Sequence, residues 1–232
     1  MLKVLESAVP VSCWSCSVAH NPSTLFCPQC TKIQPPTGGD YFSVFSIEPK
    51  LNVDLAVLEQ EFHRLSRRLH PDRFARASQN ERDWSLADTA LLNDAYRTLK
   101  DPIRRTQYLL KLHGAEIGEE HAGKGRQDPS RAPADLLEEV FDLNMQLEEL
   151  RLTRASGEED DDPAVLQSLT EAKKKFEGLL AEVDEDLRAQ WNAWDNGDEA
   201  ARAEAQNKMV ALLDRRRYLS NLVREVNETL GA

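Results

Sequence analysis

The sequence predicts an all-α protein that consists of a helical hairpin, a three-helix bundle and a small N-terminal cysteine-rich module. Three observations lead to this prediction. Apolar residues recur at spacings of three and four after residue 54, which is typical of amphipathic helices. All four cysteines lie before residue 31, and stretches rich in proline or glycine separate the helical segments. At 232 residues, the chain is long enough for more than one domain.

The composition argues against several classes of function. The chain has 40 acidic and 29 basic residues, and its net charge of -11 opposes nonspecific binding to nucleic acid and to anionic membrane surfaces. No run of eighteen apolar residues occurs, so no membrane span is predicted. Residues 1–12 contain one basic residue, Lys3, which Glu6 opposes, and they resemble neither a signal peptide nor an Arg-rich transit peptide. We therefore expect no such presequence within this numbering.

The cysteines form two CxxC pairs with ten residues between the pairs: Cys13 and Cys16, then Cys27 and Cys30. Two such knuckles bring four thiolates around one tetrahedral ion, for which we expect Zn²⁺ in a closed site with no open position for a substrate. About 30 residues bury too little surface to fold alone, so the expected role of the metal is structural. Paired disulfides and iron in a rubredoxin-like site remain alternatives.

Residues 31–39, which follow the cysteines, contain two prolines and two glycines. This composition predicts a hinge with few contacts. The first predicted domain therefore covers residues 1–39, including the hinge, and the second covers residues 40–114.

The second domain is predicted to contain the helical hairpin. Pro71 lacks an amide hydrogen and moves His70 out of the α region, so a helix that begins at about Asp54 must end near Leu69. Each helix of the hairpin carries an apolar stripe with helical spacing, and we expect the two stripes to pack together. The first stripe is Leu55, Leu58, Phe62, Leu65 and Leu69, and the second is Trp84, Ala87, Leu91, Ala95 and Leu99.

The side of the first helix opposite its stripe carries Arg64, Arg67 and Arg68. These residues are spaced three and four apart, so they share one face, which we expect to be solvated and to suit an acidic protein partner. After the hairpin, Asp101-Pro102 is expected to end one helix and to start the next, which closes at Gly114.

These features resemble the J domain of DnaJ-type co-chaperones. The resemblance rests on His70-Pro71-Asp72 between two helices, on residues 40–42 (Asp-Tyr-Phe) before them, and on residues 92–99 (LNDAYRTL) in the second helix. It implies that His70, Pro71 and Asp72 stimulate the ATPase of a DnaK-type chaperone, and that the basic face docks on that partner. The alternative is an Arg-rich solvated helix followed by an ordinary proline turn.

A polar linker is predicted over residues 115–132, and we assign it no chemistry because its Gly123-Lys124 pair lacks the rest of a phosphate-binding loop. The last domain, residues 133–232, is expected to form an antiparallel three-helix bundle. Asp162 is expected to cap a helix that starts at Pro163, after an acidic loop, and residues 196–198 (Asn-Gly-Asp) form the next turn. The expected seams are Leu136, Val140, Leu143, Leu147 and Leu150; Ala172, Phe176, Leu179 and Val183; and Met209, Leu212, Leu219, Val223 and Val226.

The first helix of this bundle has more apolar surface than its seam requires. Leu137 and Phe141 lie about 120° from the seam at 100° per residue, so they face water unless another helix or the hairpin domain covers them. An exposed pair of this kind is typical of a protein-binding surface.

Residues 136–147 (LLEEVFDLNMQL) and 108–114 (YLLKLHG) extend the resemblance over essentially the whole chain, to the HscB/Jac family of iron-sulfur-cluster J-type co-chaperones. The resemblance implies a J domain and a three-helix domain in an L shape, with the N-terminal zinc module of eukaryotic members. It implies binding of an IscU/Isu-type scaffold through seven positions: Leu137, Phe141, Asp142, Met145, Gln146, Glu149 and Phe176. Met145 departs from the family pattern, which usually has an acidic residue there, and periodicity alone places Phe176 in the core.

The predicted function is that of a non-enzymatic co-chaperone that presents a scaffold carrying a nascent cluster to a DnaK-type ATPase, in the mitochondrial matrix by family resemblance or in the cytosol. No GxSxG, HExxH, Walker A or GxGxxG motif occurs. One alternative is a zinc-knuckle adaptor without ATPase stimulation. Another is a CxxC redox enzyme, but no βαβ pattern surrounds the cysteines. The chaperone paralogue and the oligomeric state stay open.

Overall fold

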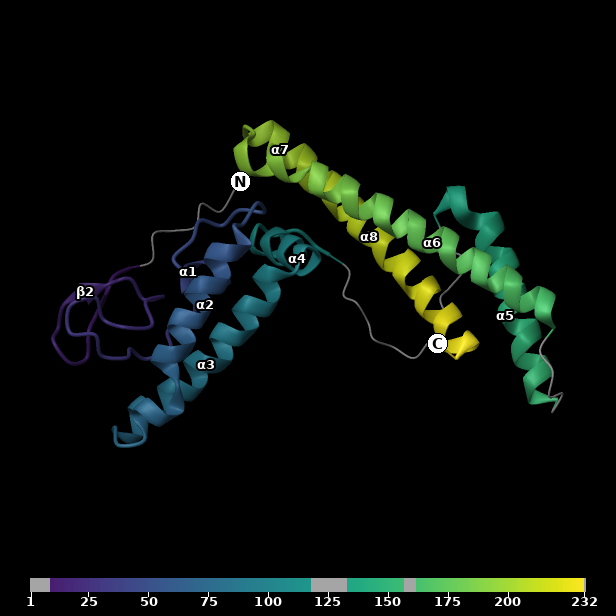
Figure 1. Cartoon of the computed structure of the whole chain (residues 1–232). Helices are drawn as coiled ribbons and strands as arrows, with labels where there is room; N and C mark the ends of the chain where they lie inside the picture. Colours follow the sequence, from purple (N-terminus) through teal and green to yellow (C-terminus); the bar gives the residue numbers. More distant parts are fainter. Residues whose placement is uncertain (1–8, 118–132, 157–161, 232) are drawn as a thin grey trace. The chain divides into compact units, whose positions relative to one another are not determined.

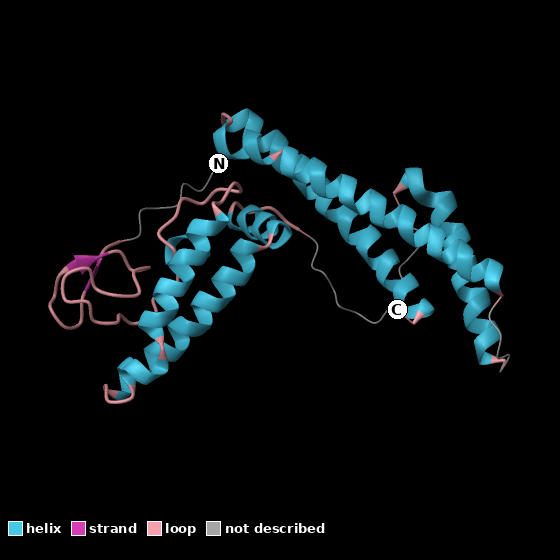
Figure 2. Ribbon diagram, viewed as in Figure 1, coloured by secondary structure: helices cyan, strands magenta, loops and turns pink. Residues whose placement is uncertain are grey.

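The structure, a computed structural model, describes residues 9–117, 133–156 and 162–231. The chain forms two compact units, and the boundary between them in the sequence lies between Ala115 and Glu116 (Figure 1). Most of the regular structure is helical, as predicted (Figure 2). The predicted linker from residue 118 onward, with Gly123-Lys124, and the acidic run from residue 158 to residue 161 lie outside the described residues. None of the helices in the described ranges is long and apolar enough to cross a membrane.

The first unit begins with a two-stranded antiparallel ribbon and continues with helices. Its elements are β1 (Val11–Ser12), β2 (Ala19–His20), α1 (Tyr41–Val44), α2 (Leu55–Leu69), the 3-10 helix η1 (Pro71–Phe74), α3 (Gln79–Lys100) and α4 (Pro102–Leu112).

The helix ends of this unit follow the sequence signals. Asp54 caps α2 by accepting hydrogen bonds from two amides of the first turn, and α2 ends at Leu69, as predicted. Asp101 caps α4 in the same way, with Pro102 as its first residue, and Gly114 follows α4 with a φ of 80°. These predictions are confirmed.

The prediction of the two apolar stripes of the hairpin is only partly correct. Leu58, Leu65 and Leu69 are buried, but Leu55, the first residue of α2, is 49% exposed, whereas Leu51 in the preceding loop is fully buried. On α3, Ala95 and Leu99 are buried as expected.

The N-terminal half of α3 buries a different face from the predicted one. Ala87 is exposed, whereas Ser85, Asp88 and Leu92 are buried. The face is displaced because this half of α3 packs against the N-terminal module as well as against α2. Ser85 also donates a hydrogen bond of 2.6 Å to the carbonyl of Leu69, the last residue of α2.

The expectation that a hinge separates the N-terminal module from the hairpin is wrong. The N-terminal module, residues 9–39, packs on the hairpin through three side-chain contacts between residues distant in the sequence. The rings of Trp14 and Trp84 meet edge to face, Lys32 forms an ion pair with Glu81, and the guanidinium of Arg68 lies over the ring of Phe26. The described residues before Ala115 therefore belong to one unit.

The second unit contains the 3-10 helix η3 (Ala134–Leu136), α5 (Leu137–Ala155), α6 (Pro163–Ala189), a short α7 (Trp191–Asn196) and α8 (Glu199–Leu230). The helix α7 was not predicted. Asp162 caps α6, and Asp198 caps α8 after the Asn196-Gly197 turn, as the sequence indicates.

Leucines dominate the core of this unit. All five residues of the first predicted seam are buried, together with Phe176, Val183, Leu219 and Val226. On α8, Leu213 and Leu222 are buried in place of the predicted Leu212 and Val223, which are only partly covered. Two ion pairs tie η3 and the start of α5 to the other helices: Arg215 of α8 with Asp135 of η3 at 2.8 Å, and Lys175 of α6 with Glu139 of α5 at 2.8 Å.

Asp88 gives a prediction about stability. Its side chain is 1% exposed, neither carboxylate oxygen has a hydrogen-bond partner among the described residues, and burial raises its pKa to about 7. The unfolded chain titrates near the ordinary value of 3.8, so the folded state holds the proton more tightly. Ionisation of Asp88 therefore does not lower the free energy of unfolding at low pH. The loss grows as the pH rises toward 7 and reaches at most about 4 kcal/mol above pH 7.

We expect Asp88→Asn to flatten this pH dependence. Between about pH 5 and about pH 8, the free energy of unfolding should fall for the wild type by more than for the variant. Denaturant titrations across this range measure the effect, and Asp94→Asn, at an exposed position of the same helix, serves as the matched control. Parallel pH profiles for the wild type and Asp88→Asn would mean that the Asp88 carboxyl is not buried in the protein.

Candidate functional sites

The four cysteines lie in two turns of the same construction. In each turn, the residue after the second cysteine donates an amide hydrogen bond to the carbonyl of the first cysteine: Ser17 to Cys13 at 2.9 Å, and Thr31 to Cys27 at 3.0 Å. Ser17 and Thr31 both have positive φ values, of 61° and 60°. This repeated turn points each cysteine pair toward the other pair.

The sulfur atoms are placed to hold one metal ion. The Sγ atoms of Cys13 and Cys30 are 3.6 Å apart, as are those of Cys16 and Cys27, and all four Sγ atoms lie within 4.8 Å of one another. Tetrahedral Zn–S bonds of about 2.3 Å require S–S separations of about 3.8 Å, so the geometry fits such an ion. The four cysteines are free thiols rather than disulfides.

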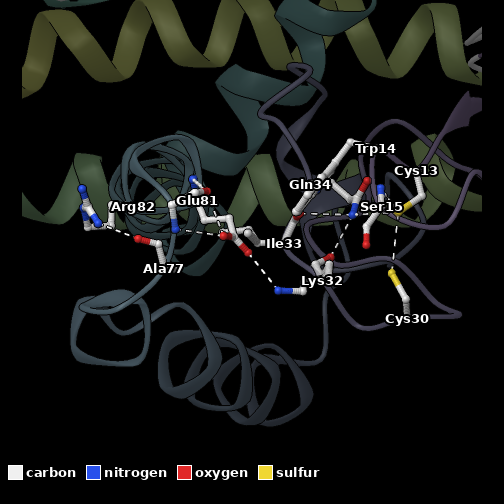
Figure 3. Close-up of polar contacts among 11 residues, drawn as sticks. Cys13, Trp14, Ser15, Cys30, Lys32, Ile33, Gln34, Ala77, Glu81 and Arg82 are labelled. Carbon is white, nitrogen blue, oxygen red and sulfur yellow. Dashed lines mark hydrogen bonds and ion pairs between the residues drawn. The ribbon is translucent and has the colours of Figure 1, made fainter.

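Hydrogen bonds from nearby N–H groups orient the sulfur ligands. The Ser15 amide and the side-chain amide of Gln34 both approach the Cys13 sulfur, at 3.4 Å (Figure 3). Gln34 is itself held by the ring of His20, at 3.1 Å. Such outer contacts fix the direction of metal ligands, and the sequence analysis missed Gln34 because no local spacing links it to the cysteines.

The thiols influence one another's ionisation. Burial alone would raise the pKa of Cys13, but amide hydrogen bonds from Cys16 and Ser15, together with hydrogen bonds from the Cys30 and Cys16 side chains, lower it to about 6. The amide of Val18 favours the Cys16 thiolate, yet burial and the neighbouring sulfurs raise the pKa of Cys16 to about 12. Four adjacent thiolates need a cation to balance their charge, so metal binding and thiol deprotonation are coupled.

The second candidate site is the exposed turn between α2 and α3. The ring nitrogen Nδ1 of His70 accepts a hydrogen bond of 3.3 Å from the Asp72 amide, and lies 3.5 Å from the Asp72 carboxylate. The Asp72 side chain is 90% exposed, and Pro71 is also exposed. The turn therefore presents a carboxylate that a partner protein can reach.

The three predicted arginines beside this turn have different environments. Arg67 is exposed, and Arg64 is exposed but pairs with Glu61 at 2.7 Å. The expectation of a solvated Arg68 is wrong, because its guanidinium lies 3.9 Å from the centre of the Phe26 ring. Burial lowers the pKa of Arg68, as do the positive charges of Arg64 and Arg73.

Arg73 is a fourth cation of this site that the sequence analysis did not single out. It is exposed and lies in η1, directly after Asp72. Because Arg73 directly follows Asp72 in the sequence, its position could have indicated that it belongs to this site. We call Arg64, Arg67, Arg68 and Arg73 the cationic cluster.

The third candidate site lies on α5. Leu137 and Phe141 are 50% and 63% exposed, which confirms the expectation from their angle to the seam. Met145 and Leu152 are 57% and 63% exposed and extend the same side of the helix. Leu152 was missed, although it lies seven residues, or two helical turns, after Met145. We call these four residues the α5 apolar face.

The predicted polar residues of this site separate into two kinds. Asp142 and Glu149 are exposed on α5. Gln146 is half-buried, and its side-chain oxygen accepts a hydrogen bond of 3.0 Å from Ser168 of α6. Gln146 therefore also links two helices of the unit.

Phe176 requires a correction. It is 1% exposed and belongs to the core of the second unit, as its periodicity indicated. A partner cannot contact this ring while the core is intact, so Phe176 supports the packing of the unit and is not part of its accessible surface.

Comparison with curated proteins gives consistent relatives, although no family model matches the chain. The chain is 37% identical over 167 residues to the human "Iron-sulfur cluster co-chaperone protein HscB", covering 70% of this chain and 65% of the human protein, slightly less than two thirds. It is 30% identical over 223 residues to the mouse protein of the same name, covering 94% and 82% of the two chains. A "Co-chaperone protein HscB homolog" of Vibrio vulnificus is 33% identical over 153 residues, covering 66% and 82%.

Solved structures agree with these relatives. The crystal structure of human co-chaperone protein HscB superposes with a TM-score of 0.64 at 28% sequence identity, covering 94% of this chain and 98% of that one. Chaperone HscB from Vibrio cholerae gives a TM-score of 0.57 at 26% identity, covering 82% and 96%.

The cysteine site predicts how metal removal acts. We expect one bound metal ion per chain, and we expect a strong chelator to unfold residues 13–30, because such ions supply roughly 10 to 16 kcal/mol of folding free energy. The Trp14 contact with Trp84 should then be lost, while α2 to α4 keep most of their helical signal, since leucines bury their facing sides.

Metal analysis, tryptophan fluorescence and far-UV circular dichroism together measure these effects. Cys27→Ser without chelator is the matched control and should reproduce the fluorescence change. Unaltered fluorescence after complete metal loss would contradict metal-dependent folding of the module.

Proposed function

Because the chain belongs to the HscB family of iron-sulfur cluster co-chaperones, we propose that it binds an IscU/Isu-type scaffold protein that carries a nascent cluster, and presents this scaffold to a DnaK-type ATPase chaperone. Cluster transfer onward follows from stimulated ATP hydrolysis by the chaperone. We place this activity in the mitochondrial matrix, and we assign no catalytic reaction to the chain itself.

The observation that carries the proposal is the presence of two surfaces of opposite character on two separate units. The first unit presents an exposed Asp72 beside the cationic cluster, on a protein whose net charge is -11. Such a local excess of positive charge suits an acidic chaperone surface and speeds its encounter. We assign this contact to residues 40–114.

The second unit presents the α5 apolar face, which we assign to the scaffold, within residues 133–232. Four large apolar side chains that are half or more exposed on one side of a helix are typical of a protein-binding surface. Asp142 and Glu149 are exposed next to them and favour a partner with basic residues around an apolar patch. The two contacts then lie on different units.

We propose that the metal of the cysteine module is zinc in a structural role. All four positions of the tetrahedron are sulfurs, so a substrate has no ligand position to occupy. The module acts as part of the chaperone-binding unit, since it packs on α2 and α3.

A second candidate function is that of an adaptor that binds partners without stimulating an ATPase. The exposed α5 apolar face and the exposed Asp72 turn fit both functions, and the two functions differ in whether Asp72 is needed to stimulate an ATPase. The first experiment below separates them.

Asp72→Asn is expected to abolish stimulation of the chaperone's ATPase and to leave the fold intact, because substitutions at exposed positions usually change stability by less than about 0.5 kcal/mol. Single-turnover ATP hydrolysis by a DnaK-type chaperone measures the effect, with Asp94→Asn as the control. Full stimulation by Asp72→Asn would favour the adaptor.

The Leu137→Ala, Phe141→Ala double variant is expected to weaken scaffold binding by at least about a hundredfold, because burying each side chain contributes roughly 1.5 to 3 kcal/mol. Its melting temperature should barely change, whereas Phe176→Ala should cost about 3 to 5 kcal/mol of stability. Calorimetric titration against purified scaffold, with melting curves, gives both quantities. Leu55→Ala, Val57→Ala, two exposed apolar residues of the other unit, is the control. Unchanged affinity together with a large loss of stability would remove the α5 apolar face from the proposal.

A further inference from the structure

Phe26 is the residue of the N-terminal module whose ring contacts the cationic cluster in the part of the chain that the structure describes. Its ring lies against the guanidinium of Arg68, 3.9 Å from the ring centre. We propose that Phe26 is a positioning residue for chaperone binding: it holds Arg68 ready for a carboxylate of the chaperone, so that metal binding by the module sets the strength of the coupling. This inference rests on the function proposed above.

The position of Phe26 depends directly on the metal site. Phe26 precedes the ligand Cys27, and its backbone pairs with that of Ile33 across the second cysteine turn. The amide of Cys27 donates to the carbonyl of Lys32 at 2.8 Å and closes this turn. Without metal, the module loses most of its folding free energy, so this turn opens and Phe26 loses its place.

Two contacts on α3 hold the module in place while Phe26 reaches α2. The ring of Trp14 lies 5.7 Å from that of Trp84, and Lys32 pairs with Glu81 at 3.2 Å. Figure 3 shows Lys32 extending from the module toward Glu81. The module thus bridges both helices of the hairpin, and Phe26 approaches Arg68 from a supported position.

Arg68 has the properties of a cation prepared for a partner. Within the described ranges, no carboxylate pairs with it, whereas Arg64 is already paired with Glu61. A ring stacked on the flat face of a guanidinium leaves the N–H groups at its edge available for a carboxylate. An arginine that is already ordered loses less side-chain entropy when it binds.

The neighbouring charges explain why the side chain needs support. Arg64 and Arg73 lie close enough to lower the pKa of Arg68, so the cations of the cluster repel one another. Without the ring, this repulsion disperses the Arg68 side chain. Phe26 counters it by a cation–π contact, which is worth a factor of about three to thirty when partly desolvated.

The first experiment separates positioning from general stability. Phe26→Leu keeps an apolar side chain but removes the aromatic face, and Phe26→Tyr restores that face. We expect Phe26→Leu to raise the half-saturating chaperone concentration about three- to tenfold, with the maximal ATPase stimulation unchanged. Phe26→Tyr should behave as the wild type, and so should Lys208→Ala, which removes an exposed ion pair of the second unit.

A double-variant comparison identifies Arg68 as the group through which Phe26 acts. Arg68→Met keeps an apolar stem over the ring and should also weaken coupling. Adding Phe26→Leu to it should then change nothing further, since the two residues act through one contact. Additive effects of the two substitutions would overturn the inference.

Metal removal provides a test that holds even if Phe26→Leu fails to retain metal. Chelation should raise the half-saturating concentration for the wild type but not for Arg68→Met, and an equal change in both would overturn the inference. NMR relaxation of the Arg68 side-chain N–H gives a readout without the chaperone: the group should be ordered in the metal-bound wild type and mobile in Phe26→Leu or after chelation. An Arg68 of equal order in all three states would also overturn it.

Measuring Asp72→Asn in the same series distinguishes a failure of the Phe26 inference from a failure of the proposed function. If Asp72→Asn abolishes stimulation while Phe26→Leu leaves the half-saturating concentration unchanged, the inference fails and the proposed function stands. If the wild type gives no stimulation that depends on Asp72, the proposed function fails, and the inference fails with it.

Discussion

Pro71 imposes the constraint on which the first unit depends. It has no amide hydrogen to continue α2, and it forces His70 to an extended ψ of 129°. The chain therefore turns away at Leu69, and α3 returns along α2 to bury the leucines of both helices. The same termination places Arg67 and Arg68 in the last turn of α2, where positive charge is favoured by the helix dipole.

The cysteine module adds a second layer to this arrangement. Its four sulfurs need a cation, the cation closes the turns, and the closed turns place Trp14, Phe26 and Lys32 against the hairpin. A metal site with no open ligand position can in this way influence a surface without taking part in any reaction. Phe26 directly precedes the ligand Cys27 in the sequence, and its ring contacts Arg68, so one residue connects the metal site to Arg68.

Local patterns in the sequence predicted most of what depends on one helix or one turn. Leu137 and Phe141 were assigned to the outside of α5 from their angle alone, and Asp162 was recognised as a cap from the proline that follows it. The spacing of the cysteines was sufficient to predict their convergence. In each case the determining residues lie within a few positions of one another, or belong to a repeated motif.

Predictions failed where distant segments meet. Asp88 was not expected in a buried position, and Arg68 was assigned to solvent, because the docking of residues 9–39 on α3 and α2 leaves no periodic signal. The proline- and glycine-rich stretch suggested a free hinge, but composition describes the stiffness of a segment and not the affinity of the surfaces it connects. Phe176 shows the opposite case, since its spacing correctly indicated the core while family resemblance suggested contact with a partner.

The unequal lengths of the helices in the second unit affect which of them can separate from the others in a local opening. α8 has 32 residues and α6 has 27, whereas α5 has 19 and spans at most about 29 Å. Figure 1 shows α6 and α8 running side by side, with α7 at one end and α5 along the other half. Amide protons of α5 should exchange with solvent through a local opening that leaves the α6 and α8 pair closed. A partner that covers α5 would then oppose this local opening, and a surface contact would protect the backbone amides beneath it.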